Sequence, residues 1–178
     1  KLVAMLPGSR PAEICRHLPV LTKSARQLER KDIRVVFAPG RLCTEKQISE
    51  CKDIVFLPKP FCAKDLLTAS DAAIVASGTA TLEAVLCGVP FAAIYRTDPI
   101  TYFIGKQILG LPYVSLPNWI LNQMIFPEIL QRALTEDNLV STISNLLEPS
   151  ISSNLKISAN YVRQMLGQPG AAKRTAQL

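Results

Sequence analysis

Short, uninterrupted apolar runs limit most strongly what this chain can fold into. They occupy Leu2–Leu6, residues 54–57, Ala72–Ala76 and Phe91–Tyr95, and residues 33–37 form a similar β-branched run that contains one charged residue, Arg34. Strands of a sheet with one wet face alternate apolar and polar residues, whereas continuous runs are typical of parallel strands that are buried on both faces. The runs therefore predict a parallel sheet covered by helices on both sides.

Helical patterns separate these runs. After Pro11, apolar residues recur at spacings of three and four from Ile14 to Leu28, which predicts a helix with one buried stripe. We expect a last short strand and loop over residues 113–118. Further helices are predicted over residues 44–51, 63–69, 81–86, 99–109, 127–133, 137–147 and 151–166. The alternation of strand and helix indicates an α/β, Rossmann-like, doubly wound fold.

The length of 178 residues suits one well-packed domain. We expect residues 1–148 to form the sheet domain and residues 149–178 to form a C-terminal helix and tail, with the last helix lying away from the sheet. The chain begins at Lys1 inside an apolar run. We interpret this start as that of a fragment of a longer protein.

Charge and composition limit the classes of partner and of site that this chain could have. The formal net charge of +6 favours a nucleic acid, an anionic lipid or a phosphorylated small molecule as partner. The Lys and Arg residues are scattered without interleaved aromatic residues, which disfavours nucleic-acid binding. The chain has one histidine and five cysteines without a CxxC spacing, so we expect reduced cytosolic thiols, no metal and no cofactor. No apolar run approaches the roughly 20 residues of a membrane span.

Two glycine turns follow predicted strands. They are Gly8-Ser9-Arg10 after the first strand and Ser77-Gly78-Thr79 after the run Ala72–Ala76. Ligands of open parallel sheets bind beyond the carboxyl ends of the strands. If the strand order reverses between these two strands, both turns face one crevice.

The chemistry of the turns suits a diphosphate. Gly78 would let the backbone approach a ligand, and the helix after it would offer unpaired N–H groups with a partial positive charge. Arg10 would add a two-pronged cation. Ser77, Thr79 and Thr81 would add hydroxyl donors. An ordinary helix N-cap, without a ligand, remains the alternative for the second turn.

Glu83 follows Thr79 by four residues. A carboxylate there would repel a phosphate, so it suits a neutral group that donates hydrogen bonds, such as the two hydroxyls of a ribose. A charge that complements the helix dipole is the alternative. Neither turn matches a Walker A loop or a GxGxxG fingerprint, which disfavours an NTPase or a nicotinamide dehydrogenase.

Two more positions are predicted to matter less. His17 lies off the main apolar stripe of the first helix, so we interpret it as a surface or helix-packing residue rather than a base. Tyr95 and Arg96 end the strand Phe91–Tyr95, where a ligand could reach them.

Four segments together resemble the lipid-A-disaccharide synthases. They are LPGSRPAEI at 6–14, SDAAIVASGTATLEAVLCGVPFAAIYR at 70–96, YVSLPN at 113–118 and PEILQ at 127–131. The resemblance implies the glycosyltransferase B fold, in which the carboxyl-terminal half binds the UDP of UDP-2,3-diacylglucosamine. It implies transfer of the sugar, without a metal, to 2,3-diacylglucosamine 1-phosphate to form the lipid A disaccharide.

The resemblance also assigns roles to residues. It places Arg10 in the turn that faces the donor diphosphate, Glu83 at the ribose, and Asn118 in a loop that closes over the donor. Because a transfer without a metal needs cations and oriented N–H groups at the leaving diphosphate, we expect Arg10 to be the catalytic cation, together with the helix that begins at Gly78. The phosphate-facing residues it implies are Gly8, Ser9, Arg10, Ser77, Gly78 and Thr79. Residues 122–124, Asn-Gln-Met, depart from the Gly-Arg-Glu that often stands there in the family.

The implied partners lie outside the chain. They are an N-terminal half that carries the acceptor site and the catalytic base, and the cytoplasmic face of the inner membrane of Gram-negative bacteria, where the enzyme works peripherally. A homodimer stays open. Two alternatives stay open as well: another UDP-sugar enzyme of the same fold, such as a UDP-N-acetylglucosamine epimerase or the peptidoglycan glucosaminyltransferase, and a nucleotide-binding module without catalysis.

Overall fold

A sheet of five parallel strands forms the centre of the computed structural model, which describes residues 1–38, 40, 54–58, 60–98, 110, 112–168 and 170. The strand order is β2-β1-β3-β4-β5, and every neighbouring pair is parallel. The strands are β1 (Leu2–Leu6), β2 (Arg34–Phe37), β3 (Ala72–Ala76), β4 (Phe91–Tyr95) and β5 (Glu128–Leu130). The predicted doubly wound α/β fold is confirmed.

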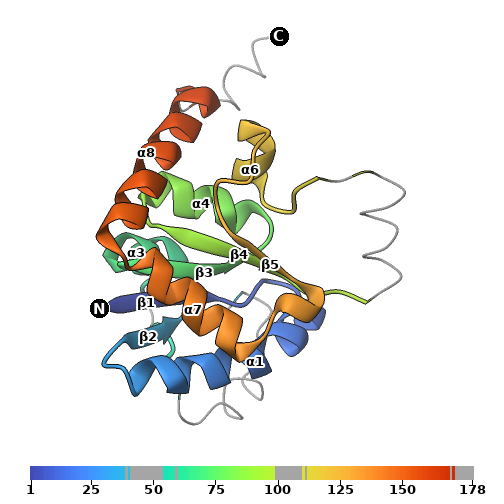
Figure 1. Cartoon of the computed structure of the whole chain (residues 1–178), viewed down its shortest axis with the longest axis vertical. Coiled ribbons are helices and arrows are strands. Elements are labelled where there is room, and N and C mark those ends of the chain that lie inside the picture. The colour runs from blue at the N-terminus through green and yellow to red at the C-terminus, as the bar shows by residue number, and fades with distance from the viewer. Residues whose placement is uncertain are drawn as a thin grey trace.

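Helices cover both faces of the sheet (Figure 1). On one face lie α1 (Pro11–Glu29) and α7 (Glu136–Leu146), which pack against each other. On the other face lie α3 (Ala63–Ala69) and α4 (Thr79–Cys87). Outside α4 lie α6 (Leu116–Leu121) and α8 (Pro149–Leu166). This layering explains why β1, β3 and β4 are apolar throughout, since a strand with helices on both faces has no side exposed to solvent.

The core is continuous across the sheet. All five residues of β3 are buried, as are the first four of β4. Phe91 of β4 stacks on Phe126, with ring centroids 4.6 Å apart and planes 15° from parallel. Burial of this apolar surface supplies the main stabilisation of the fold.

The strand order places a switch point between β1 and β3. The chain leaves β1 towards β2 on one side and then returns past β1 to form β3 on the other side. Leu6 pairs with Val75, so the carboxyl ends of β1 and β3 lie next to each other. The condition under which the two glycine turns share one crevice is therefore met.

The strand expected at residues 54–57 does not form. Phe56 makes an isolated parallel bridge to Phe37, with hydrogen bonds of 2.9 Å from Phe37 N to Val55 O and 2.8 Å from Leu57 N to Phe37 O. Pro58 cannot donate to a ladder. Ala38 N donates to Met5 O at 3.0 Å, on the β1 side of β2.

The assignments for residues 113–118 and 127–133 were wrong. The expected last strand is instead a loop followed by the helix α6, and the expected helix is instead the short strand β5 followed by a 3-10 turn over Gln131–Ala133. Both segments are too short for their periodicity to decide between helix and strand. The free edge of β4 settles the second case, because Ile129 pairs with Ile94 there.

The last helix packs onto the domain. Leu155, Ala159 and Val162 of α8 are buried, and α8 contacts α4, α6 and α7. It therefore covers the α4 layer. Among the described residues, no helix combines the length and apolarity needed to cross a membrane. The helices expected over residues 44–51 and 99–109, and the tail from residue 171, lie outside the described residues.

Candidate functional site

The turn after β1 needs a glycine. Gly8 has a φ of +117°, and a Cβ there would lie 2.8 Å from Glu13 Oε2 and 3.4 Å from Ala76 Cβ. A side chain would be strained by the backbone and would collide with Glu13 as well. The turn therefore lies directly against the carboxyl end of β3.

A third loop meets this turn. Gly40, after β2, approaches so closely that a Cβ on it would overlap the Gly8 carbonyl oxygen and lie 2.7 Å from Ser9 Cα. This contact was not predicted from the sequence. The signal was the place of Gly40 after a parallel strand, because such loops all meet at one edge of the sheet.

Arg10 lies at the mouth of the site. It is the N-cap residue of α1, and its Nη1 lies 3.2 Å from Glu13 Oε1. The Arg10 side chain is 78% exposed. The Glu13 side chain is only 14% exposed, whereas the Arg10 guanidinium reaches into solvent and is accessible to an anion there.

The start of α4 is open to a ligand. Gly78 is its N-cap residue, with φ +137° and ψ −158°, and a Cβ there would have no atom within 4 Å. No side chain caps this end, and the first turn carries no acidic residue. The first N–H groups of the nine-residue helix therefore stand at the switch point beside the Gly8 turn.

Two of the three predicted hydroxyl donors are committed elsewhere. Ser77 Oγ donates to the Val114 carbonyl oxygen. Thr81 is buried, and its Oγ1 donates to Gly78 O at 2.7 Å. The Thr79 hydroxyl is exposed at the helix start. The backbone N–H groups and Thr79, rather than a cluster of hydroxyls, therefore form the donor set of this turn.

Glu83 lies on the exposed side of α4, one turn after Thr79. Residues four apart lie on the same helix face, so the Glu83 carboxylate is displaced along α4 from the N–H groups at its start. No ion pair involves Glu83 within the described part of the chain. This placement separates a carboxylate from an anion that binds at Gly78.

Asn118 has a structural role in this arrangement. It is buried; its Nδ2 donates to Phe126 O at 2.8 Å and to Glu128 Oε1 at 2.9 Å. Its Oδ1 accepts from Ile125 N at 3.0 Å and from Phe126 N at 2.9 Å. Both donor hydrogens and the carbonyl oxygen are thus engaged, so we do not carry Asn118 into the proposed donor site.

Glu128 organises the same segment and was missed by sequence reasoning. Its carboxylate accepts from Val114 N, Ser115 N and Ser115 Oγ at 2.9–3.0 Å, in addition to Asn118. Because Val114 O in turn accepts from Ser77, Glu128 helps to hold the turn before α4. A Glu in a Pro-Glu-Ile-Leu stretch carries no local signal for such a role.

His17 and Arg96 connect further loops at this edge. His17 is buried, and its Nδ1 lies 2.8 Å from Pro7 O while its Nε2 accepts from Arg96 N at 3.0 Å. Of the two roles expected for His17, the surface position is wrong because the ring is buried, whereas a packing role within the fold is confirmed. The Arg96 guanidinium donates to Gln131 O and Leu134 O, so it is engaged within the fold rather than aimed at a ligand.

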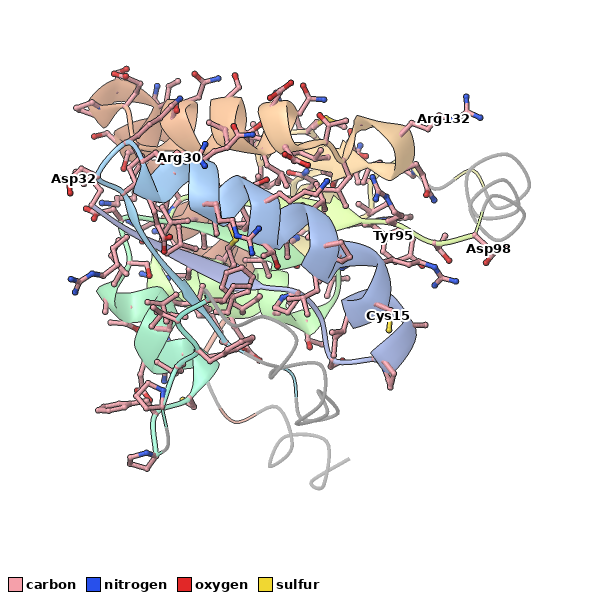
Figure 2. The ribbon with its side chains drawn as sticks, turned by 90° about the horizontal axis from the view of Figure 1, so that it is seen from below. Cys15, Arg30, Asp32, Tyr95, Asp98 and Arg132 are labelled. Carbon is pink, nitrogen blue, oxygen red and sulfur yellow. The ribbon has the colours of Figure 1, made fainter. Side chains whose placement is uncertain are left out.

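Figure 2 shows how these parts gather. Cys15, near the start of α1, lies at the same end of the molecule as Tyr95, Asp98 and Arg132. Arg30 and Asp32, between α1 and β2, lie at the opposite end. The loops that follow β1, β4 and β5 therefore share the carboxyl edge of the sheet. Among the described residues, no group of three His, Cys, Asp or Glu side chains could hold a metal ion.

Comparisons with known proteins agree on one family. The family model for lipid-A-disaccharide synthetase matches residues 1–178. The lipid-A-disaccharide synthase of Persephonella marina is 35% identical over 188 residues, covering 100% of this chain and 50% of the relative. That of Syntrophus aciditrophicus is 34% identical over 182 residues, covering 98% of this chain and 47% of the relative. The chain thus spans about half the length of the curated relatives that it matches.

The fold comparison points the same way. The crystal structure of the glycotransferase of kitacinnamycin superposes with a TM-score of 0.59 at 17% identity, covering 91% of this chain and 39% of that one. This likeness shows the fold alone, which is that of the Rossmann-like half of a glycosyltransferase B enzyme. The match of the family model over the whole length shows that the chain belongs to the lipid-A-disaccharide synthetase family.

Proposed function

We propose that this chain is the donor-binding half of a lipid-A-disaccharide synthase. The complete enzyme transfers 2,3-diacylglucosamine from UDP to 2,3-diacylglucosamine 1-phosphate and forms the lipid A disaccharide. The observation that carries the proposal is the open N-terminus of α4 beside the Gly8 turn, at the switch point between β1 and β3. In a chain of this family, that place suits the diphosphate of the donor.

The leaving group sets the chemical task. As the bond between the sugar and the diphosphate breaks, negative charge builds on the phosphate oxygen that leaves. N–H groups already oriented at the start of α4 stabilise this charge without reorganising. Arg10 adds a full positive charge when its guanidinium turns from Glu13 to the diphosphate.

The ribose would lie along α4. Its two neighbouring hydroxyls are donors that match the two oxygens of the Glu83 carboxylate, and Glu83 is exposed one turn from Thr79. Pyrophosphate has no ribose. Comparing its binding with the binding of UDP therefore distinguishes the contact of Glu83 with the ribose from the contacts with the phosphates.

The remaining functions belong to parts that this chain does not contain. We infer that a partner half supplies the acceptor site and the base that deprotonates the acceptor hydroxyl. The acylated substrates place the reaction at the cytoplasmic surface of the inner membrane, where the complete enzyme would bind peripherally. A homodimer is compatible with this arrangement.

Titration calorimetry with UDP tests the proposal. The chain should bind UDP, and Gly78→Ala should weaken binding because a side chain at φ +137° shifts the turn and the first N–H groups of α4. Gly167→Ala is the matched control, since Gly167 also has a positive φ of +74° with no atom within 4 Å of a Cβ, but lies after α8. Absence of UDP binding by the unaltered chain, or equal loss in both variants, would contradict the proposal.

A further inference from the structure

The one histidine of the chain joins two loops at the candidate site. His17 belongs to α1, Pro7 immediately precedes the Gly8 turn, and Arg96 follows β4. The His17 ring lies 2.8 Å from Pro7 O through Nδ1 and 3.0 Å from Arg96 N through Nε2. The ring is completely buried, so water cannot replace either partner.

These two partners determine the protonation state of the ring. The backbone N–H of Arg96 can only donate, so Nε2 must carry a lone pair. The Pro7 carbonyl oxygen can only accept, so Nδ1 must carry the hydrogen. The geometry therefore requires the neutral Nδ1–H tautomer, because an imidazolium would point an N–H at the N–H of Arg96.

The link extends to a third strand. Arg96, whose N–H binds His17, uses its guanidinium to hold the carbonyl oxygens of Gln131 and Leu134, after β5. A chain of hydrogen bonds thus runs from the turn after β1, through His17, to the loops after β4 and β5. His17 is its connection to the Gly8 turn.

We propose that His17 is a positioning residue for donor binding, which holds the Gly8-Ser9 turn at the carboxyl edge of the sheet while it is the neutral Nδ1–H tautomer. Protonation of the ring breaks the bond to Arg96 and loosens the turn that faces the diphosphate. His17 does not itself contact the donor in this proposal. The effect on UDP binding rests on the proposed function, whereas the effect on the turn does not.

The surroundings of the ring favour the neutral form. Burial lowers the pKa of His17 below its ordinary value of 6.5 and outweighs the opposing effect of the Pro7 carbonyl. The charged groups that act on the ring are Glu13 and Arg16 from α1 and Arg96 from the end of β4. The Glu13 carboxylate favours the charged form, whereas the two guanidinium groups disfavour it.

Nitrogen NMR of the unaltered chain tests the link without a ligand. Because the chain has one histidine, all imidazole nitrogen signals belong to His17. We expect a protonated Nδ1 and an unprotonated Nε2 at pH 7.5, and amide shifts of Gly8 and Ser9 that follow the titration of the ring below pH 6.5. An Nε2–H tautomer or an imidazolium at pH 7.5 would overturn the proposal. So would Gly8 and Ser9 amide shifts that stay constant while the ring titrates.

A variant then tests the consequence for donor binding. In His17→Asn the amide nitrogen can still donate to Pro7 O, but the acceptor for Arg96 N–H is lost. UDP should bind about two- to tenfold more weakly at pH 7.5, the range expected for one net hydrogen bond. Ser24→Ala is the control, because Ser24 is buried on the same helix and, among the described residues, its hydroxyl donates within that helix, to Val20 O.

The pH profile separates positioning from a general loss of structure. The terminal phosphate of UDP itself titrates at about pH 6. The informative quantity is therefore the difference in UDP affinity between the unaltered chain and His17→Asn at each pH. We expect the unaltered chain to lose additional affinity for UDP as pH falls below 6.5, and His17→Asn to lack this additional loss. Identical profiles would overturn the proposal. If UDP does not bind the unaltered chain at any pH, the proposed function fails, while the amide shifts still decide the role of His17.

Discussion

At the scale of single residues, the site depends on which polar groups are still uncommitted. Ser77, Thr81 and Asn118 all bear suitable groups, but they donate to Val114 O, Gly78 O and Phe126 O respectively. A group that already has a buried partner must lose that hydrogen bond before it can bind a ligand. The Arg10 side chain is 78% exposed, and its described side-chain partner is the largely buried Glu13 carboxylate at 3.2 Å, so its guanidinium remains accessible to a ligand.

Arg10 should therefore matter for the transition state more than for stability. We expect Arg10→Ala to lower the turnover of the complete transferase by about ten- to a thousandfold, the range for one lost donor to a developing negative charge. Arg30→Ala is the control, because Arg30 is an exposed residue at the other end of the same helix. Steady-state kinetics with equal turnover for both variants would remove Arg10 from the mechanism.

At the scale of elements, the two ends of α4 differ. No side chain caps its N-terminus, whereas its C-terminal carbonyl groups are capped by Arg163 of α8. Arg163 Nε donates to Val85 O at 2.9 Å, and Nη2 donates to Leu86 O. A cation at a helix C-terminus also complements the helix dipole. The helix α8 thus fixes the element whose other end forms the candidate site.

Removing this cap should destabilise the fold. Arg163→Ala should lower the free energy of unfolding by about 1–2 kcal/mol, because two carbonyl groups lose a charged donor at a half-exposed site. Arg163→Lys should recover only part of this loss, since an ammonium cannot reproduce the fork of the guanidinium. Urea unfolding measures the difference, with the exposed Lys156→Ala on the same helix as control. Equal stability of Arg163→Ala and Lys156→Ala would show that the cap contributes nothing.

At the scale of the whole molecule, stability should depend on pH through two groups. Burial lowers the pKa of His17 in the folded state. As the pH falls below 6.5, the unfolded chain therefore binds a proton at His17 more readily than the folded chain does. The folded-state pKa of Asp71 is lowered mainly by hydrogen bonds from Lys1 and from Leu2 N, at 2.9 and 2.8 Å. Both shifts make the unfolded state the better proton acceptor in acid.

The sign of the effect follows from these directions. Above pH 6.5 the contribution of His17 is complete, and it is lost as pH falls from 6.5 towards the lowered pKa of the folded state. The contribution of Asp71 is lost in more acid solution, below its ordinary value of 3.8. Urea unfolding between pH 7.5 and 5 should therefore show falling stability in the unaltered chain. In His17→Asn the slope across this interval should be smaller, and an equal slope would contradict the assignment to His17.

The sequence by itself determined the class of the fold and the place of its two principal turns. Continuous apolar runs predicted β1, β3 and β4 to the residue, because a strand buried on both faces must be apolar at every position. Gly8 and Gly78 predicted turns because their backbone conformations, at φ +117° and +137°, exclude other side chains. Burial of a strand on both faces and a positive φ each restrict the residue type at a given position, so both can be recognised from the neighbouring sequence.

Only the tertiary structure decided which groups meet. His17 and Arg96 are 79 positions apart, Ser77 and Val114 are 37 apart, and Gly40 touches the turn at Gly8. The edge of β4 likewise turned residues 128–130 into a strand where the sequence pattern indicated a helix. A hydrogen-bond partner or a free sheet edge depends on how distant segments pack, and the composition of either segment alone does not encode it.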